Sequence, residues 1–128
     1  MRFLCSTNLN FANFEVVEAS TGAEALEHAR AGEFDLVLLD VMLPDMGGLE
    51  VAQKLMDDER TGAMPIVFLS ARATREDLSA GYALGAVDYI TKPFDPVELG
   101  WRVREILARV ERGESERYRQ ERLAELKE

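Results

Sequence analysis

The chain has 128 residues, of which 47% are hydrophobic and 30% are charged, and its formal net charge is −9. This length suits a single domain, and this hydrophobic fraction excludes a disordered chain. The acidic balance argues against direct binding of nucleic acid, because the phosphate backbone would be repelled.

Cysteine use and hydropathy limit where the protein works. The single cysteine, Cys5, cannot form an internal disulfide, which is typical of a reducing compartment. Hydrophobic runs are too short for a membrane-spanning helix, and polar residues interrupt the first segment where a signal peptide would need an apolar stretch. We therefore expect a cytoplasmic protein with no membrane attachment.

Strand and helix patterns alternate along the chain. A short β-branched run at residues 14–19 predicts a strand, and Ser20 or Thr21 can cap a following helix that ends at Gly32. Beyond this helix we expect strands at residues 35–39, 65–70 and 88–92, and helices at residues 49–58, at residues 74–84 and after Asp95.

The last of these helices has the clearest start signal. Asp95 can serve as the N-cap, Pro96 suits the first helical position, and Glu98 stands at the third. In the strands expected at residues 35–39 and 65–70, the residues after Asp35 and before Ser70 are continuously apolar, which is typical of strands buried on both faces of a parallel sheet. The alternation predicts a doubly wound α/β domain with right-handed crossovers.

Polar residues end three of the expected strands: Asp40, Ser70 and Lys92. Because parallel strands end at the same edge of a sheet, we expect these three side chains to lie together. A carboxylate can attack a phosphoryl group, and a hydroxyl and an ammonium can bind the phosphoryl oxygens where charge builds up. The combination therefore indicates phosphoryl chemistry, although an aspartate after a strand can also serve only to cap a turn.

Three motifs carry a resemblance to a known family: Leu-Leu-Asp-Val-Met-Leu-Pro-Asp-Met-Gly-Gly around Asp40, Pro-Ile-Val-Phe-Leu-Ser-Ala around Ser70, and Gly-Ala-Val-Asp-Tyr-Ile-Thr-Lys-Pro-Phe around Lys92. With these motifs, residues 14–110 resemble the receiver domains of bacterial two-component response regulators. The resemblance implies a flavodoxin-like, receiver-like doubly wound sheet and a role in phosphorelay signal transduction, as a phosphoprotein rather than an enzyme.

The resemblance also implies roles for individual residues. Asp40 resembles the phosphoacceptor that is loaded by a histidine kinase or a phosphotransfer protein. Ser70 resembles the switch hydroxyl, Lys92 the phosphate partner and Tyr89 the aromatic switch. The carboxylate of Asp40 and the backbone carbonyl of Met42 resemble ligands of Mg²⁺.

The front of the chain departs from the family pattern. Receivers begin with a strand that ends in a pair of acidic residues and is followed by a helix, but residues 1–13 contain no Asp or Glu. We therefore expect a weak Mg²⁺ site and impaired phosphorylation of Asp40. Glu15, Glu18 and Asp45 are weaker candidates to replace the missing acids.

The short front segment also predicts an unusual sheet. A parallel crossover commonly takes a dozen or more residues. Three arrangements are therefore open: residues 2–5 form a strand that pairs antiparallel, two chains exchange elements and form a homodimer, or the start is truncated and only a partly ordered receiver without its usual first strand and first helix remains.

The expected organisation has three parts: an atypical N-terminal segment at residues 1–13, a receiver-like domain at residues 14–110, and a charged helical extension or linker at residues 111–128. The first functional hypothesis is a receiver module that signals to an output domain or partner protein. The second is a degenerate receiver that acts only in protein interaction or dimerisation. A phosphohydrolase is the third, and it is disfavoured because Met42 stands where such an enzyme needs a second acid.

Overall fold

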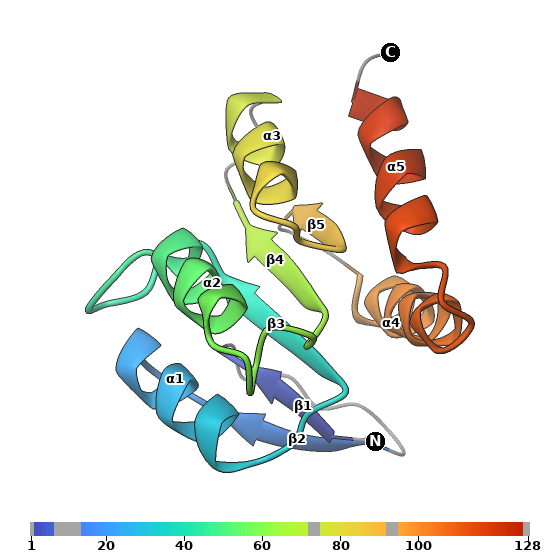
Figure 1. The fold of residues 1–128 in the computed structure, drawn as a ribbon. Helices are drawn as coiled ribbons and strands as arrows, with labels where there is room; N and C mark the ends of the chain where they lie inside the picture. Colours follow the sequence, from blue (N-terminus) through green and yellow to red (C-terminus); the bar gives the residue numbers. More distant parts are fainter. Residues whose placement is uncertain (1, 7–13, 72–74, 92–94, 127–128) are drawn as a thin grey trace.

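The computed structural model describes residues 2–6, 14–71, 75–91 and 95–126. Within these ranges the elements follow one another in the order β1 (Arg2–Cys5), β2 (Glu15–Glu18), α1 (Gly22–Ala31), β3 (Leu36–Asp40), α2 (Gly48–Asp57), β4 (Ile66–Ser70), α3 (Arg75–Ala83), β5 (Asp88–Thr91), α4 (Pro96–Glu111) and α5 (Ser115–Leu126) (Figure 1). Each strand and helix expected from residue 14 to the helix after Asp95 is present, with bounds shifted by one or two residues at most.

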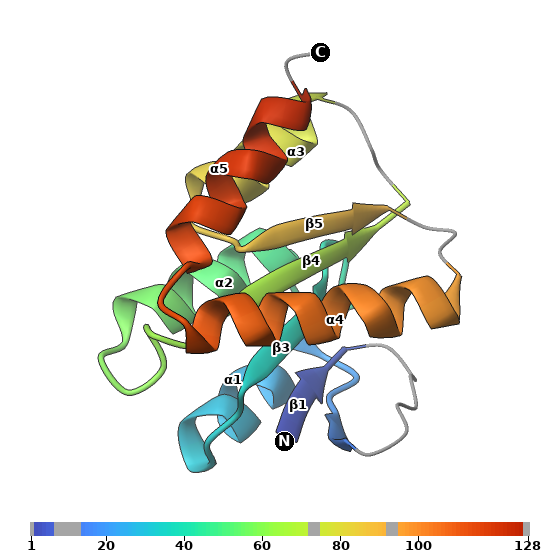
Figure 2. The same ribbon diagram turned by 90° about the vertical axis from the view of Figure 1, so that its right-hand side faces the viewer.

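The strands form one five-stranded sheet in the order β2-β1-β3-β4-β5, and all neighbouring pairs are parallel. Helices α1, α2 and α3 lie on one side of the sheet and α4 lies on the other (Figures 1 and 2). The α5 helix lies beside β5, in contact with both α3 and α4. This arrangement confirms the doubly wound α/β fold.

Each face of the sheet has its own hydrophobic core, because successive residues of a strand point to opposite faces. Val37 and Leu39 of β3 belong to the core that α1, α2 and α3 cover. Leu36 and Leu38 belong to the core that α4 covers. Both sets are buried, which explains why the strand is a continuous apolar run rather than an alternating one.

Helix boundaries follow the expected capping residues. The Thr21 hydroxyl accepts a hydrogen bond from the backbone N–H of Glu24 at 3.1 Å, and the Asp95 carboxylate accepts one from the N–H of Val97 at 2.8 Å. Gly85 follows α3 with a φ of 105°, a conformation that residues with a side chain rarely adopt. None of the helices within the described ranges is long and apolar enough to cross a bilayer.

A strand does form at residues 2–5, but the antiparallel pairing expected for it was wrong. β1 lies between β2 and β3 and pairs parallel with both, so the slot beside the Asp40 strand is filled by this chain's own residues. Beyond the end of β1, the N–H of Ser6 donates to the carbonyl oxygen of Leu38, while the Cys5 carbonyl accepts from Ala19. An antiparallel pairing, a missing strand and an exchange between chains are therefore not needed to complete the sheet.

The short lengths of β1 and β2 explain why the parallel pairing of β1 was not predicted. Each strand has four residues, so the chain must return about 13 Å between them, at roughly 3.3 Å per residue. The nine residues at positions 6–14 can reach about 30 Å when extended, which is enough. The rule of a dozen residues holds for longer strands with a helical crossover. The expectation that the first helix is missing concerns residues 7–13, which lie outside the described residues.

Candidate functional site

Two of the expected functional residues lie on adjacent strand ends. Asp40 is the last residue of β3 and is partly exposed, and Ser70 is the last residue of β4 and is 3% exposed. The register pairs Asp40 with Leu69 and Ser70 with Thr91, so the ends of β3, β4 and β5 share one edge of the sheet. Lys92 would follow Thr91 at this edge, but it lies outside the described residues.

A third strand contributes a residue that the sequence analysis missed. The hydroxyl oxygen of Ser6, just beyond β1, accepts a hydrogen bond of 2.6 Å from the backbone N–H of Asp40. Ser6 therefore lies at the edge where the carboxylate of Asp40 is held. The available signal was a polar residue directly after the apolar run at residues 3–5, which is the pattern that also singled out Asp40 and Ser70.

A tight turn fixes the chain directly after Asp40. Met42 and Gly47 form an isolated antiparallel bridge, and the N–H of Gly48 donates to the carbonyl oxygen of Val41 at 2.7 Å. A Cβ atom on Gly48 would lie 2.1 Å from the carbonyl oxygen of Asp40, so only glycine allows α2 to begin this close to the strand end. The turn therefore holds the backbone of Asp40 and Met42 in a defined position.

Asp45 in the same turn has a structural task. Its two carboxylate oxygens accept hydrogen bonds from the N–H groups of Gly22 at 2.7 Å and Ala23 at 3.0 Å. These bonds, that of Gly22 foremost, hold the pKa of Asp45 below its ordinary value. The carboxylate thus serves the N-terminus of α1, where negative charge is favoured, and it is a poor candidate to replace a missing metal ligand.

Tyr89 is buried against α3. Its side chain is 3% exposed, and its ring centroid lies 6.0 Å from that of Phe68. A Cβ atom on Gly81 of α3 would lie 2.9 Å from Tyr89 Cδ2, so the helix approaches the ring closely only because this position is glycine. Tyr89, the aromatic residue of β5 that is expected to act as a switch, therefore packs against Phe68 of β4 and Gly81 of α3.

The oxygen atoms at this edge offer a thin site for Mg²⁺. No group of three or more His, Cys, Asp or Glu side chains among the described residues could hold a metal ion. Asp40 supplies one carboxylate, the Met42 carbonyl is a further candidate, and Ser6 contributes a neutral hydroxyl where a second carboxylate would strengthen the site. Mg²⁺ is commonly held by one or two carboxylates with water and phosphate oxygens completing its shell. With one carboxylate rather than two, the described residues fit Mg²⁺ at the weaker end of this range.

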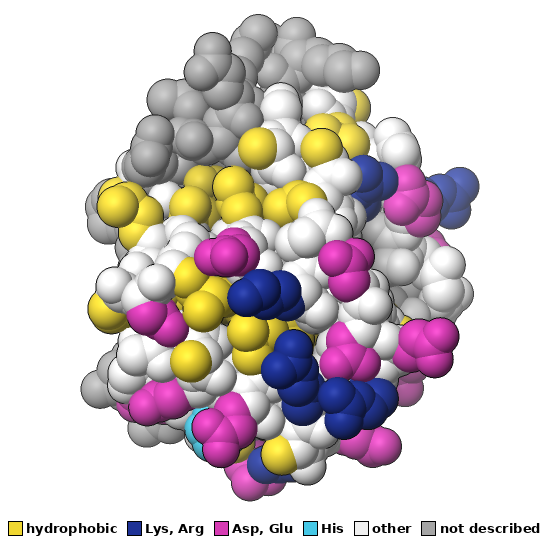
Figure 3. Space-filling model, turned by 60° about the vertical axis from the view of Figure 1, so that its left-hand side comes forward, with side chains coloured by type: hydrophobic (Ala, Val, Ile, Leu, Met, Phe, Trp, Pro, Cys, Tyr) yellow, Lys and Arg dark blue, Asp and Glu magenta, His cyan; other side chains and the backbone are white. Residues whose placement is uncertain are grey.

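The surface away from this edge is mixed in charge. The face that carries α1 and α2 shows basic side chains interspersed with acidic ones, with hydrophobic side chains between them (Figure 3). Several of the charges pair with each other, as Arg30 does with Asp58 at 3.5 Å and Lys54 with Glu50 at 4.0 Å. On this face some of the basic side chains are therefore paired with acidic neighbours.

Comparison with known proteins gives the same picture as the geometry. Residues 1–104 match the family model described as the response regulator receiver domain. The DNA-binding dual master transcriptional regulator RpaA of Synechocystis is 41% identical over 109 residues, which cover 85% of this chain and 45% of that protein. The transcriptional regulatory protein SrrA of Staphylococcus aureus is 40% identical over 111 residues, covering 87% of this chain and 45% of that protein. The chain thus spans about half the length of these curated relatives.

Solved structures resemble most of the fold. A CheY-like response regulator receiver domain protein from Methanospirillum hungatei superposes with a TM-score of 0.79 at 28% identity, covering 88% of this chain and 97% of that chain. A crystal structure described as a putative response regulator from Chloroflexus aurantiacus gives a TM-score of 0.73 at 30% identity, covering 84% of this chain and 98% of that one.

Proposed function

Because the chain belongs to the family of response regulator receiver domains, we propose that it receives a phosphoryl group on Asp40 in a phosphorelay. The observation that carries this proposal is the partly exposed carboxylate of Asp40 at the end of β3, one register position from the buried hydroxyl of Ser70. A carboxylate at such an edge can act as the nucleophile toward phosphorus.

The other residues of the site have complementary tasks in this proposal. Ser70 binds a phosphoryl oxygen through its hydroxyl, and Lys92 neutralises the negative charge. Tyr89 responds through its packing against α3, because a shift of β5 or α3 changes the space that its ring occupies. These tasks rest on the family's pattern and on the positions of the described residues.

We also propose that phosphorylation is slow. Mg²⁺ would supply positive charge that balances the phosphoryl oxygens, and Asp40 together with the Met42 carbonyl would hold it. The chain places the hydroxyl of Ser6 beside Asp40 rather than a carboxylate. A site with a single carboxylate binds the cation weakly, so the reaction is limited by metal occupancy.

The proposed setting follows from the family. The phosphoryl donor is a histidine kinase or a phosphotransfer protein, and the signal passes to an output domain or partner protein in the cytoplasm, without enzyme activity of the chain's own. Direct nucleic-acid contact and membrane attachment are not part of the proposal for residues 1–128. The boundaries at residues 13/14 and 110/111 and a homodimer stay predictions.

A second candidate function is a receiver that works through protein interaction alone. The observation that favours it is the neutral residue at the end of β1 and the absence of Asp and Glu from residues 1–13. Such a module would keep the fold and its contact surfaces and would gain no phosphoryl group under any condition.

The Asp40→Asn variant tests the acceptor directly. With acetyl phosphate and Mg²⁺, the wild-type chain is expected to gain one phosphoryl group slowly, and Asp40→Asn none, because an amide cannot form the acyl phosphate. Intact-mass spectrometry follows the modification. Asp57→Asn, at the exposed end of α2, is the control and should behave like the wild type. A phosphoryl group on Asp40→Asn would contradict the proposal, whereas none on any variant favours the interaction module.

The Ser6→Asp variant tests why phosphorylation is slow. A carboxylate at position 6 can still accept the N–H of Asp40 and adds a charged oxygen ligand for Mg²⁺. We expect the Mg²⁺-dependent rate at subsaturating metal to rise roughly tenfold or more, the scale on which a change near a metal alters its affinity. Ser6→Asn adds the same volume without the charge and should leave the rate low. Equal rates for the two variants would show that the missing charge is not what limits the reaction.

A further inference from the structure

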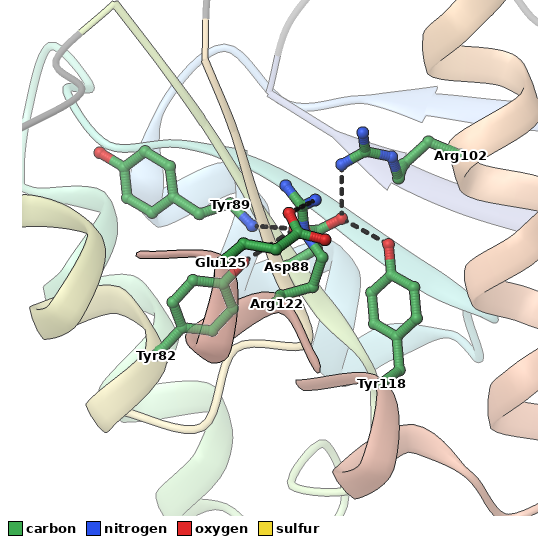
Figure 4. A network of polar contacts seen from close by, with 7 residues as sticks. All are labelled: Tyr82, Asp88, Tyr89, Arg102, Tyr118, Arg122 and Glu125. Atoms are coloured by element: carbon green, nitrogen blue, oxygen red, sulfur yellow. Dashed lines mark hydrogen bonds and ion pairs between the residues drawn. The ribbon is translucent and has the colours of Figure 1, made fainter. Parts of the chain in front are cut away.

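A buried carboxylate far from Asp40 holds the C-terminal helix in place. The side chain of Asp88, at the start of β5, is fully buried. Its Oδ1 atom accepts hydrogen bonds from the Tyr82 hydroxyl at 2.9 Å, the Tyr89 N–H at 2.8 Å and the Arg122 Nε at 2.8 Å. Its Oδ2 atom accepts from the Tyr118 hydroxyl at 2.7 Å and from Arg102 Nη1 at 3.2 Å (Figure 4).

These donors come from three helices and one strand. Tyr82 belongs to α3, Arg102 to α4, and Tyr118 and Arg122 to α5, while Tyr89 follows Asp88 in β5. Arg119 of α5 adds two hydrogen bonds to the carbonyl oxygen of Tyr82, at 3.1 and 2.8 Å. The α5 helix is thereby attached to the edge strand β5 through Asp88 and to α3 through the carbonyl oxygen of Tyr82.

The electrostatics of the cluster agree with this geometry. Burial raises the pKa values of Tyr82 and Tyr118, and the negative charge of Asp88 raises them further, so both hydroxyls stay protonated and donate. Burial acts to lower the pKa of Arg122, but the charge and hydrogen bond of Asp88 outweigh it, and the net shift is upward. The contacts thus join a buried anion to permanent cations and neutral donors.

Besides the Asp88 contacts, α5 is held by an ion pair to α4, in which Arg109 Nη2 lies 3.1 Å from Glu121, and by few buried side chains. Among the α5 residues whose burial the structure describes, only Tyr118 is buried, and Leu123 is partly buried against the core that α1, α2 and α3 cover. The other inward positions of α5 that the structure describes carry the polar residues Ser115, Arg119 and Arg122. A helix of twelve residues is marginally stable without tertiary contacts, so α5 depends on this polar attachment.

The connection to α4 permits the helix to leave. Only residues 112–114 separate α4 from α5, and Gly113 among them has a φ of 75°. The sheet does not need α5 to complete its strand pairing, whereas β3 and β4 are buried on both faces by α1 to α4. Local opening therefore has a natural boundary at this connection.

We propose that α5 is a releasable cover, which docks on α3, β5 and α4 through the Asp88 carboxylate and detaches without loss of the five-stranded sheet. In the docked state it shields the edge strand β5 and holds Tyr82 of α3 against Asp88. In the released state Asp88 and the edge of β5 become accessible. This property does not depend on whether Asp40 accepts a phosphoryl group.

Hydrogen exchange on the full chain, measured by NMR or mass spectrometry, tests the cover. In the wild type, amides of α5 are expected to exchange at least tenfold faster than those of β3 and β4. In Arg122→Ala, the α5 amides should exchange at least another tenfold faster, with β3 and β4 changed less than threefold. Tyr118→Phe keeps the ring and removes one donor, so its α5 amides should lie between the wild type and Arg122→Ala.

The control is Arg117→Ala on the same helix. The Arg117 side chain is 75% exposed and lies 3.9 Å from Glu114, so its removal makes the same change in helix propensity without touching Asp88. Its α5 amides should exchange within threefold of the wild type. The proposal is overturned if α5 and the strands exchange at one common rate, or if Arg117→Ala and Arg122→Ala accelerate α5 equally.

Discussion

Replacing Gly48 with alanine is expected to lower the free energy of unfolding by about 3 kcal/mol, the upper end of the usual cost of overpacking. The added Cβ would lie 2.1 Å from the Asp40 carbonyl oxygen and 2.8 Å from Val41 Cα. Both are backbone atoms and cannot move aside as a flexible side chain can, so either α2 or the end of β3 must shift. Urea unfolding followed by far-UV circular dichroism measures the loss as a lower midpoint at constant slope.

The neighbouring glycine is the matched control. A Cβ on Gly47 meets nothing within 4 Å, and the backbone of Gly47 has φ −73° and ψ 145°, which alanine adopts without strain. Gly47→Ala should therefore change the free energy of unfolding by less than about 0.5 kcal/mol. Similar losses in the two variants would show that the close approach of Gly48 to Asp40 is not what makes position 48 sensitive. The shift of α2 or β3 in Gly48→Ala would displace Asp40. This variant should therefore also take up the phosphoryl group more slowly than the wild type.

The sequence predicts the strands and helices from residue 14 onward because their signals are local. The apolar runs before Asp40 and Ser70 are long enough to specify buried strands, and Asp95-Pro96 specifies a helix start by capping alone. Parallel strands end at the same edge of a sheet, so the sequence alone predicts that Asp40 and Ser70 lie at one edge.

The features that the sequence did not predict depend on contacts between residues that are far apart in the sequence. The parallel pairing of β1 follows from the shortness of β1 and β2, which is known only once their ends are known. The hydrogen bond of Ser6 to Asp40 spans 34 positions, and that of Tyr118 to Asp88 spans 30. No local pattern distinguishes Asp88 from an ordinary surface aspartate, because the residues that surround it come from three different helices. The role of Gly48 is visible only as a distance to a backbone atom.

Asp88→Ala is expected to destabilise the chain by about 3 to 5 kcal/mol, the cost of removing one partner from a buried ionic cluster. The Asp88 carboxylate is fully buried, and Arg122, Arg102, Tyr82 and Tyr118 all direct donors to it. While α5 stays docked, alanine leaves the buried hydroxyl groups of Tyr82 and Tyr118 without this acceptor. Thermal and urea unfolding at neutral pH measure the change.

Asp95→Ala provides the comparison within the same stretch of chain. Asp95 is exposed and caps α4 through one hydrogen bond to Val97, so its replacement should cost about 1 kcal/mol. Combining Asp88→Ala with Arg122→Ala adds a stricter test, since both variants break the same pair and their costs should fall well short of additive. Asp88→Ala with Arg117→Ala should be additive, because Arg117 does not contact Asp88. Additivity in both pairs would mean that α5 is held by contacts other than Asp88, such as the ion pair of Glu121 with Arg109, and that the Asp88 carboxylate serves only α3, α4 and β5.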